Sequence, residues 1–276
     1  MSLDLFAPIA AAYTAGTGKD ISTFRYEDAP LSSPVIVISG VILYLVAVHG
    51  GAYLMRDRKP FKLNGLFRIH NLLLTIISGA LLLVFIPEII PLLANGPHYA
   101  LCSAKAWNSR LEFLYYINYL IKWYELLDTA FLVLKKKNLE FLHYFHHSMT
   151  MALCFSQLHG RTTVSWVPIT LNLGVHVAMY YYYYRAAGGH QMWWKKYLTT
   201  LQITQFIIDL ACVYYCVAKR ITFHYLPHLS TGDCEGGGWF AGYFGAAILT
   251  SYLLLFIHFY FKTYKRPAAA VNKKKQ

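Results

Sequence analysis

Long apolar runs, separated by short polar segments, dominate the chain. A membrane-spanning helix needs about 20 mainly apolar residues, and seven stretches of about that length occur in the sequence. The predicted helices are Pro34–Met55, Leu66–Ile86, Leu111–Leu134, Leu139–Leu158, Val164–Tyr184, Tyr197–Val217 and Trp239–Phe261. Pro87, Pro91 and two glycine runs fall in the gaps between them. This pattern predicts an all-α membrane protein with seven transmembrane helices.

Composition agrees with this class, and the distribution of charge adds a topology. The chain is 57% hydrophobic and only 14% charged, unlike ordinary soluble proteins. Lys and Arg concentrate after the first, third, fifth and last predicted helices. Because short cytosolic loops are rich in these residues, we expect a lumenal amino terminus and a cytosolic carboxyl terminus. The net charge of +12 then reflects topology, so the expected partner is membrane lipid and no nucleic acid is expected.

These patterns divide the chain into three parts. Residues 1–33 form a lumenal N-terminal segment, residues 34–262 the seven-helix membrane domain, and residues 263–276 a basic cytosolic tail. The first segment mixes charged residues with Gly and Pro and has no signal-peptide layout, so we expect the first apolar helix to remain in the mature protein. The third, fourth and sixth predicted helices contain ionisable groups, which should lower their hydropathy.

Four consecutive predicted helices each carry polar residues on one face. A rotation of about 100° per residue aligns the members of each set. The sets are Lys122, Glu125, Asp128 and Thr129; His143, His146 and His147; Asn172, His176, Met179, Tyr180 and Tyr183; and Thr199, Gln202, Gln205 and Asp209. Ionisable groups are costly in a bilayer and usually serve a function inside the bundle. We therefore expect a shared polar interior.

Some of these residues also have simpler explanations. Taken alone, Asn172, Gln202 and Gln205 are better explained as side chains that hydrogen-bond between membrane helices than as catalytic groups. Lys122 beside two carboxylates would neutralise buried charge without doing chemistry. The isolated histidines are interpreted as packed or interfacial side chains; they are His49, His70 and His258.

The segment LHYFHH, residues 142–147, is compatible with several kinds of chemistry. Imidazoles one turn apart can share a metal ion, with His176 as a further ligand. Di-iron membrane enzymes need several such motifs and this chain has one, so we expect no metal, although a histidine-metal oxidoreductase or hydrolase stays an alternative. An uncharged imidazole in an apolar interior can instead attack a thioester and carry the acyl group. Spacing leaves open which histidine attacks, and a seven-helix receptor or transporter using Lys122 is the other alternative.

The cysteines fall into two groups. Cys102 and Cys234 lie in predicted lumenal segments, whereas Cys154, Cys212 and Cys216 lie inside predicted helices. The lumen permits oxidation, so we predict a disulfide between the first two. The other three are interpreted as small buried apolar side chains.

The four polar faces also form ordered motifs. KWYELLDT, LHYFHH, NLGVHVAMYYYYY and TTLQITQF resemble, in order and separation, K-x-x-E-x-x-D-T, H-x-x-H-H, N-x-x-x-H-x-x-M-Y-x-Y-Y and T-x-x-Q-x-x-Q of the ELO family of very-long-chain fatty acid elongases. One H-x-x-H-H motif is weak evidence, but four motifs in order are specific. The helix count and basic tail extend the likeness over nearly the whole chain. The run starting at QLHGRTT and the GDC around Cys234 look most like the fungal branch.

The resemblance implies a very-long-chain 3-ketoacyl-CoA synthase of the endoplasmic reticulum membrane, an acyltransferase that condenses acyl-CoA with malonyl-CoA and releases carbon dioxide and CoA. In that family, helices two to seven form a barrel around an acyl tunnel, so residues 34–262 would be the catalytic domain. The mechanism would be ping-pong, with His146 taking the acyl group, His176 assisting, and His143 and His147 in support. Supporting residues would be Lys122, Glu125, Asp128 and Asn172, and substrate-binding residues Tyr180, Tyr183, Gln202, Gln205, Lys135, Lys136 and Lys137.

The same resemblance sets expectations for partners and substrates. No tightly bound cofactor is expected, only acyl-CoA and malonyl-CoA as substrates. The ketoacyl reductase, dehydratase and enoyl reductase must be separate proteins, because no dinucleotide-binding glycine motif occurs. A homodimer is a family-level expectation, and Lys273 and Lys274 occupy the positions of a dilysine retrieval signal. Leu139 stands where members that favour polyunsaturated chains carry Gln, which favours saturated and monounsaturated acyl-CoA.

Overall fold

The computed structural model describes residues 4–264, and these form helices and turns without any strand. Most of the basic tail, including Lys273 and Lys274, lies outside the described residues. The helices are α1 (Ala7–Thr17), η1 (Ile21–Thr23), η2 (Tyr26–Asp28), α2 (Pro34–Leu54), α3 (Asn64–Ala94), α4 (Pro97–Cys102), η3 (Ala104–Ala106), α5 (Ser109–Glu125), α6 (Leu127–Leu134), α7 (Phe141–His159), η4 (Thr163–Ser165), α8 (Trp166–Ala187), α9 (Lys195–Tyr225), η5 (Pro227–Leu229) and α10 (Trp239–Tyr264).

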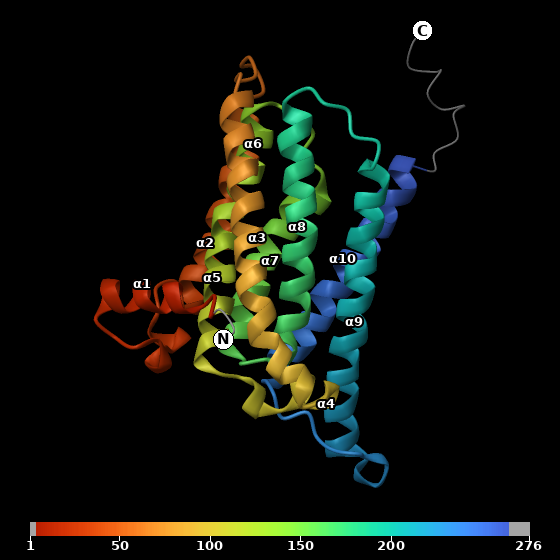
Figure 1. The fold of residues 1–276 in the computed structure, drawn as a ribbon. Helices are drawn as coiled ribbons and strands as arrows, with labels where there is room; N and C mark the ends of the chain where they lie inside the picture. Colours follow the sequence, from red (N-terminus) through yellow and green to blue (C-terminus); the bar gives the residue numbers. More distant parts are fainter. Residues whose placement is uncertain (1–3, 265–276) are drawn as a thin grey trace.

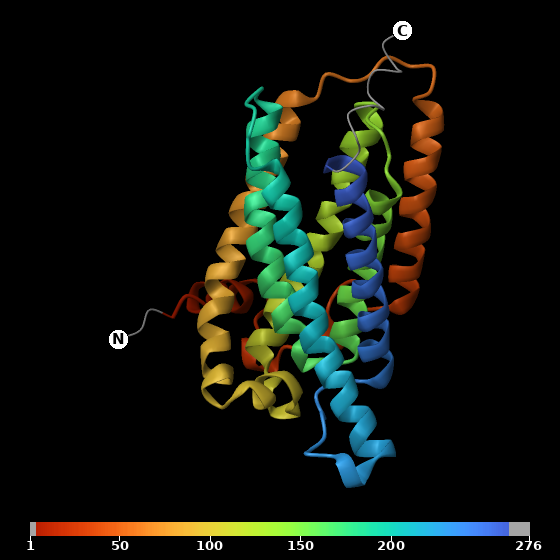
Figure 2. The same cartoon turned by 90° about the vertical axis from the view of Figure 1, so that its right-hand side faces the viewer.

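The long helices pack in a closed circuit (Figure 1). α3 packs against α8, α8 against α9, α9 against α10, α10 against α7, α7 against α5, and α5 back against α3. α2 lies outside this circuit, against α6 and α7. At one end, here called the basic end, lie the loops 55–63, 135–140 and 188–194 (Figure 2). The opposite end, here called the disulfide end, carries α4 and residues 226–238.

The protein has the character of a membrane protein. α2, α3, α9 and α10 are each long and apolar enough to cross a membrane. Low hydropathy was expected in the sixth predicted helix, but this is wrong, because that helix is α9 and it is apolar enough to cross a membrane. The fifth predicted helix, α8, is less apolar and is not among these four. Asn172, His176 and the tyrosines 180–184 lower the hydropathy of α8.

Two helices differ from the prediction. Pro87 and Pro91 lie inside α3 rather than in a gap after it. A proline removes one backbone donor, but neighbouring helices commonly compensate for this in membrane helices. The third predicted helix is divided at Leu126 into α5 and α6. The K-x-x-E-x-x-D-T motif therefore spans a junction, with Glu125 ending one helix and Asp128 in the first turn of the next.

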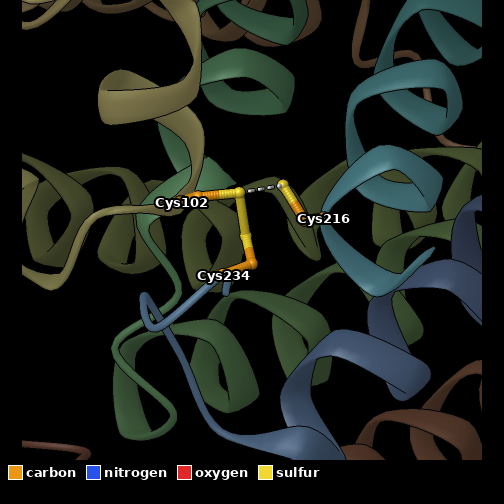
Figure 3. Close-up of side chains that lie close together, drawn as sticks. All are labelled: Cys102, Cys216 and Cys234. Atoms are coloured by element: carbon orange, nitrogen blue, oxygen red, sulfur yellow. Dashed lines mark hydrogen bonds between the residues drawn. A yellow bond between two sulfur atoms is a disulfide. The ribbon is translucent and has the colours of Figure 1, made fainter. Parts of the chain in front are cut away.

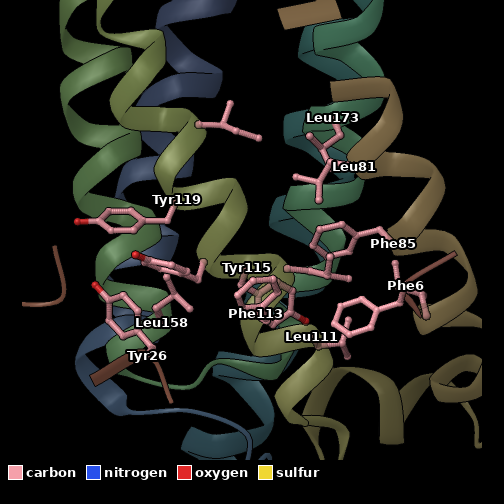
Figure 4. Close-up of a cluster of buried hydrophobic side chains, with 14 of the residues drawn as sticks. Phe6, Tyr26, Leu81, Phe85, Leu111, Phe113, Tyr115, Tyr119, Leu158 and Leu173 are labelled. Carbon is pink, nitrogen blue, oxygen red and sulfur yellow. The ribbon is translucent and has the colours of Figure 1, made fainter. Parts of the chain in front are cut away.

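Apolar side chains around α5 form the largest buried cluster (Figure 4). Phe85, Leu111 and Tyr119 in this cluster are fully buried. The N-terminal segment joins it through Phe6, whose ring packs edge-on against Phe113 at 6.4 Å between centroids. This packing fixes α5, the helix that carries the first polar motif.

Candidate active site

A buried ion pair lies at the centre of the polar interior. Lys122 Nζ lies 2.9 Å from Glu125 Oε1 and also donates to Asn172 Oδ1 at 2.9 Å. Lys122 and Glu125 are each only 2% exposed. A charge in such surroundings is tolerated only with an opposite charge and further hydrogen bonds. Lys122 has both, so the first and third motifs are joined through it.

The same network fixes the tautomer of His176. Asn172 Oδ1 accepts from Lys122, so the amide Nδ2 of Asn172 faces His176 Nε2, at 3.2 Å. An amide nitrogen only donates, so His176 Nε2 accepts. The proton then resides on His176 Nδ1, which donates to Glu125 Oε1 at 3.2 Å. Both ring nitrogens of His176 are therefore committed to hydrogen bonds.

Asp128 joins three further helices. Its Oδ1 lies 2.6 Å from His70 Nε2 of α3, and its Oδ2 accepts from the Tyr180 hydroxyl at 2.8 Å. His147 Nε2 of α7 lies 3.8 Å from the same Oδ2. The other nitrogen of His70, Nδ1, lies 3.0 Å from the Tyr124 hydroxyl. Asp128 thus holds α3, α6, α7 and α8 together at one point.

The three histidines of α7 have different surroundings. The rings of His143 and His147 lie 4.5 Å apart between centroids. His146 instead packs among aromatic rings, 4.6 Å from Tyr252 and 6.0 Å from Phe256. Its Nδ1 is buried without a hydrogen-bond partner. His146 is therefore held by packing, unlike His176, which is held by hydrogen bonds.

Two cavities meet at His146. The larger, about 300 Å³, reaches the basic end, and the deeper one, about 70 Å³, lies on the disulfide side. In the described part of the chain, His146 is the one histidine among the four of the second and third motifs that lines both. A third cavity of about 60 Å³ continues toward the disulfide end. The residues shared by the first two cavities are His146, Asn172, Gln205 and Phe206.

The predicted substrate-binding residues of α8 and α9 separate into two groups. Gln202, Gln205 and Tyr183 line the larger cavity. The Tyr180 hydroxyl is instead committed to Asp128, and Tyr180 lines neither the larger nor the deeper cavity. Tyr180 therefore contributes to the hydrogen-bond network rather than to the cavity wall.

The three lysines after α6 also lie away from these cavities. Lys136 Nζ donates to the backbone oxygens of Arg56 and Arg58, at 2.8 and 3.1 Å, so it ties two loops of the basic end together. The Lys135 ammonium lies 4.4 Å from the centre of the Phe67 ring. Partial burial lowers the pKa of Lys135, and the nearby positive charge of Lys137 adds to this. The lysine that does line the larger cavity is Lys195.

Several of these residues were not predicted from the sequence. His70 was interpreted as a packed side chain, but it forms the closest contact to Asp128. The available signal was an ionisable side chain inside an apolar helix. Lys195 lies outside the predicted helix Tyr197–Val217, yet it is the first residue of α9. Tyr252 lies outside the four motifs, and no signal pointed to it.

Two of the five cysteines are joined at the disulfide end (Figure 3). Cys102 and Cys234 form the disulfide that the sequence analysis predicted, with 4.3 Å between their Cα atoms. Cys216 Sγ of α9 lies 3.9 Å from Cys102 Sγ. These three sulfur atoms lie within 4.8 Å of one another, and two of them are already bonded to each other.

The fold and the polar centre define an α-helical membrane protein with histidines set along a series of internal cavities. Residues 29–272 match the model of the ELO family, described as GNS1/SUR4, and the chain belongs to that family. It is 47% identical to putative fatty acid elongase 1 of Schizosaccharomyces pombe over 262 residues, 94% of this chain and 78% of the relative.

Two further relatives carry elongase names. Putative fatty acid elongase 2 of Schizosaccharomyces pombe is 40% identical over 262 residues, 94% of this chain and 72% of the relative. Fatty acid elongase A of Dictyostelium discoideum is 34% identical over 260 residues, 92% of both chains. The family predicted from the four motifs, including its likeness to fungal members, is thereby confirmed.

Proposed function

We propose that this protein condenses a long-chain acyl-CoA with malonyl-CoA to give 3-ketoacyl-CoA, carbon dioxide and CoA, through an acyl group carried on His146. The observation that supports this most is the place of His146 between the larger and the deeper cavity. A thioester can enter from the basic end, and its acyl chain can extend into the deeper cavity. The elongase names of the relatives support the same reaction class.

The proposed reaction has two halves. A ring nitrogen of His146 attacks the thioester carbon, the carbon–sulfur bond breaks, and the imidazole proton leaves with the CoA sulfur. Malonyl-CoA then loses carbon dioxide, and its C2 carbanion attacks the acyl carbon. The acyl–nitrogen bond breaks, and His146 takes up a proton again.

The supporting residues have distinct proposed roles. His176 has both nitrogens committed to hydrogen bonds, so it assists by fixing the network rather than by attacking. Lys122 places a positive charge beside Asn172 at the cavity junction, where it would stabilise negative charge that develops on the substrate. His143 and His147, with Asp128, would orient the start of α7. Tyr183, Gln202 and Gln205 would contact the substrate. Lys195, with Lys135 and Lys137 at the basic end, would attract the CoA phosphates.

The proposal includes an arrangement in the endoplasmic reticulum membrane. The chain would cross seven times, through α2, α3, α5 continued by α6, α7, α8, α9 and α10, with residues 34–262 as the catalytic domain. The circuit of helices would form a barrel, and the three cavities would form its acyl tunnel. The disulfide end would face the lumen, with residues 1–33, and the basic end the cytosol. Basic loops at one end and a disulfide at the other support this orientation.

Further parts of the proposal concern substrates and partners. Saturated and monounsaturated acyl-CoA would be preferred, and neither a tightly bound cofactor nor a metal would be needed. The ketoacyl reductase, dehydratase and enoyl reductase would be separate proteins in the same membrane. The protein would form a homodimer.

The test is product formation by the purified protein. Incubation with a long-chain acyl-CoA and malonyl-CoA labelled at C2 should give labelled 3-ketoacyl-CoA two carbons longer. His146→Ala should abolish this product. His159→Ala is the matched control, because His159 lies on the same helix, is exposed and lines none of the three cavities. Equal product from both variants would contradict the role of His146.

A further inference from the structure

Asp209 of α9 is a buried carboxyl group that the proposed mechanism does not use. It is fully buried, at 0% exposed, and lines the deeper cavity. Its Oδ2 accepts one hydrogen bond, from Gln205 Nε2 at 3.1 Å, and its Oδ1 is buried without a partner. No Lys, Arg or His among residues 4–264 forms an ion pair with it. A carboxyl group left this way in a membrane helix is costly and therefore needs a functional reason.

The contact with Asp209 determines which atom Gln205 offers to the cavities. A glutamine amide has an NH2 group that donates and a carbonyl oxygen that accepts. Nε2 is committed to Asp209, while Oε1 forms no hydrogen bond in the described part of the chain. Gln205 is one of the residues that line both cavities beside His146. The group free for a ligand at the junction is therefore an acceptor.

We propose that Asp209 is a positioning residue that holds the Gln205 amide with its carbonyl oxygen toward the cavity junction, where it accepts a hydrogen bond from an N–H group of the substrate. This inference rests on the proposed function. In any CoA thioester, an amide N–H lies two carbon atoms from the sulfur. A substrate whose thioester carbon lies at His146 therefore brings this donor near the junction that Gln205 lines. Without Asp209, the amide is free to rotate and to present its NH2 group instead.

A double-mutant cycle tests this role, because an effect that acts through Gln205 disappears when Gln205 is absent. The measured quantity is the single-turnover rate constant for CoA release from a long-chain acyl-CoA without malonyl-CoA. Asp209→Ala should lower it roughly tenfold, the size of one hydrogen bond between uncharged groups. Asp209→Asn keeps an acceptor oxygen, so its rate constant should fall less than that of Asp209→Ala. In a Gln205→Ala background, Asp209→Ala should have no further effect.

A second background is the matched control. Gln202 lies one turn earlier on α9 and contacts Met179 Sδ rather than Asp209, so Asp209→Ala should keep its full effect in a Gln202→Ala background. A tenfold loss that persists with Gln205→Ala would overturn the inference, as would a wild-type rate for Asp209→Ala. If Asp209→Ala does not fold, the nearly isosteric Asp209→Asn takes its place in the cycle, and its smaller loss should likewise disappear in the Gln205→Ala background. Wild-type protein that releases no CoA would overturn the proposed function itself, whereas additive losses in active protein would overturn only the role of Asp209.

Discussion

Among single substitutions in the polar interior, removal of the Glu125 carboxylate should lower the stability of the protein most. Glu125 is 2% exposed and accepts from both Lys122 and His176. Glu125→Ala would leave the Lys122 ammonium buried with Asn172 as its remaining partner. Removing one partner of a buried ion pair costs about 3–5 kcal/mol. With roughly 2–4 °C per kcal/mol for a chain of this size, the midpoint of thermal unfolding should fall by roughly 6–20 °C.

The assay is thermal unfolding of detergent-purified protein, followed by circular dichroism. The double variant Lys122→Met with Glu125→Ala is the informative comparison, because it removes both charges and leaves neither uncompensated. The double variant should recover more than half of the fall in unfolding temperature caused by Glu125→Ala. Such a recovery would show direct coupling between the two side chains. A double variant no more stable than Glu125→Ala alone would refute the reasoning.

Three further predictions concern residues around this centre. His70→Ala removes the closest contact to Asp128 and should destabilise the protein by about 1.5–3 kcal/mol in the same unfolding assay; a loss under about 0.5 kcal/mol would contradict this. Replacing Cys102 and Cys234 by serine removes a covalent link between residues 132 positions apart and should lower the free energy of unfolding by about 2–5 kcal/mol. Mass spectrometry of the purified protein checks that the disulfide forms, and its absence would contradict the prediction. Lys195→Ala should raise the KM for acyl-CoA, measured by steady-state kinetics, about threefold to fivefold. Lys136→Ala should leave this KM unchanged, because the Lys136 ammonium holds two loops together. A larger effect of Lys136→Ala than of Lys195→Ala would contradict the placement of both lysines.

The core of the candidate site was predictable because it depends on helix periodicity. Lys122 and Glu125 are three residues apart and lie on one face of a helix wherever the helix packs. The same holds for Asn172 and His176, four residues apart. Once both faces turn away from lipid, these four side chains meet, as they do in the structure.

The other parts of the fold and site could not be predicted, because they depend on contacts between helices that no local sequence pattern encodes. His70 lies outside the four motifs, and its role comes from the packing of α3 beside Asp128. Lys135, Lys136 and Lys137 looked alike in sequence, yet loop geometry commits Lys136 to backbone oxygens. Pro87 and Pro91 were expected in a gap after the second predicted helix, but both lie within α3, which continues to Ala94.

The most direct test of the acyl-histidine proposal is the mass of the protein after reaction with acyl-CoA alone. Purified protein mixed with a long-chain acyl-CoA, without malonyl-CoA, should gain one acyl group while it releases one CoA. Digestion should then place that mass on the peptide that contains His146. Adding malonyl-CoA should remove it. Release of CoA without any acylated peptide, or acylation that persists in His146→Ala, would contradict the proposal.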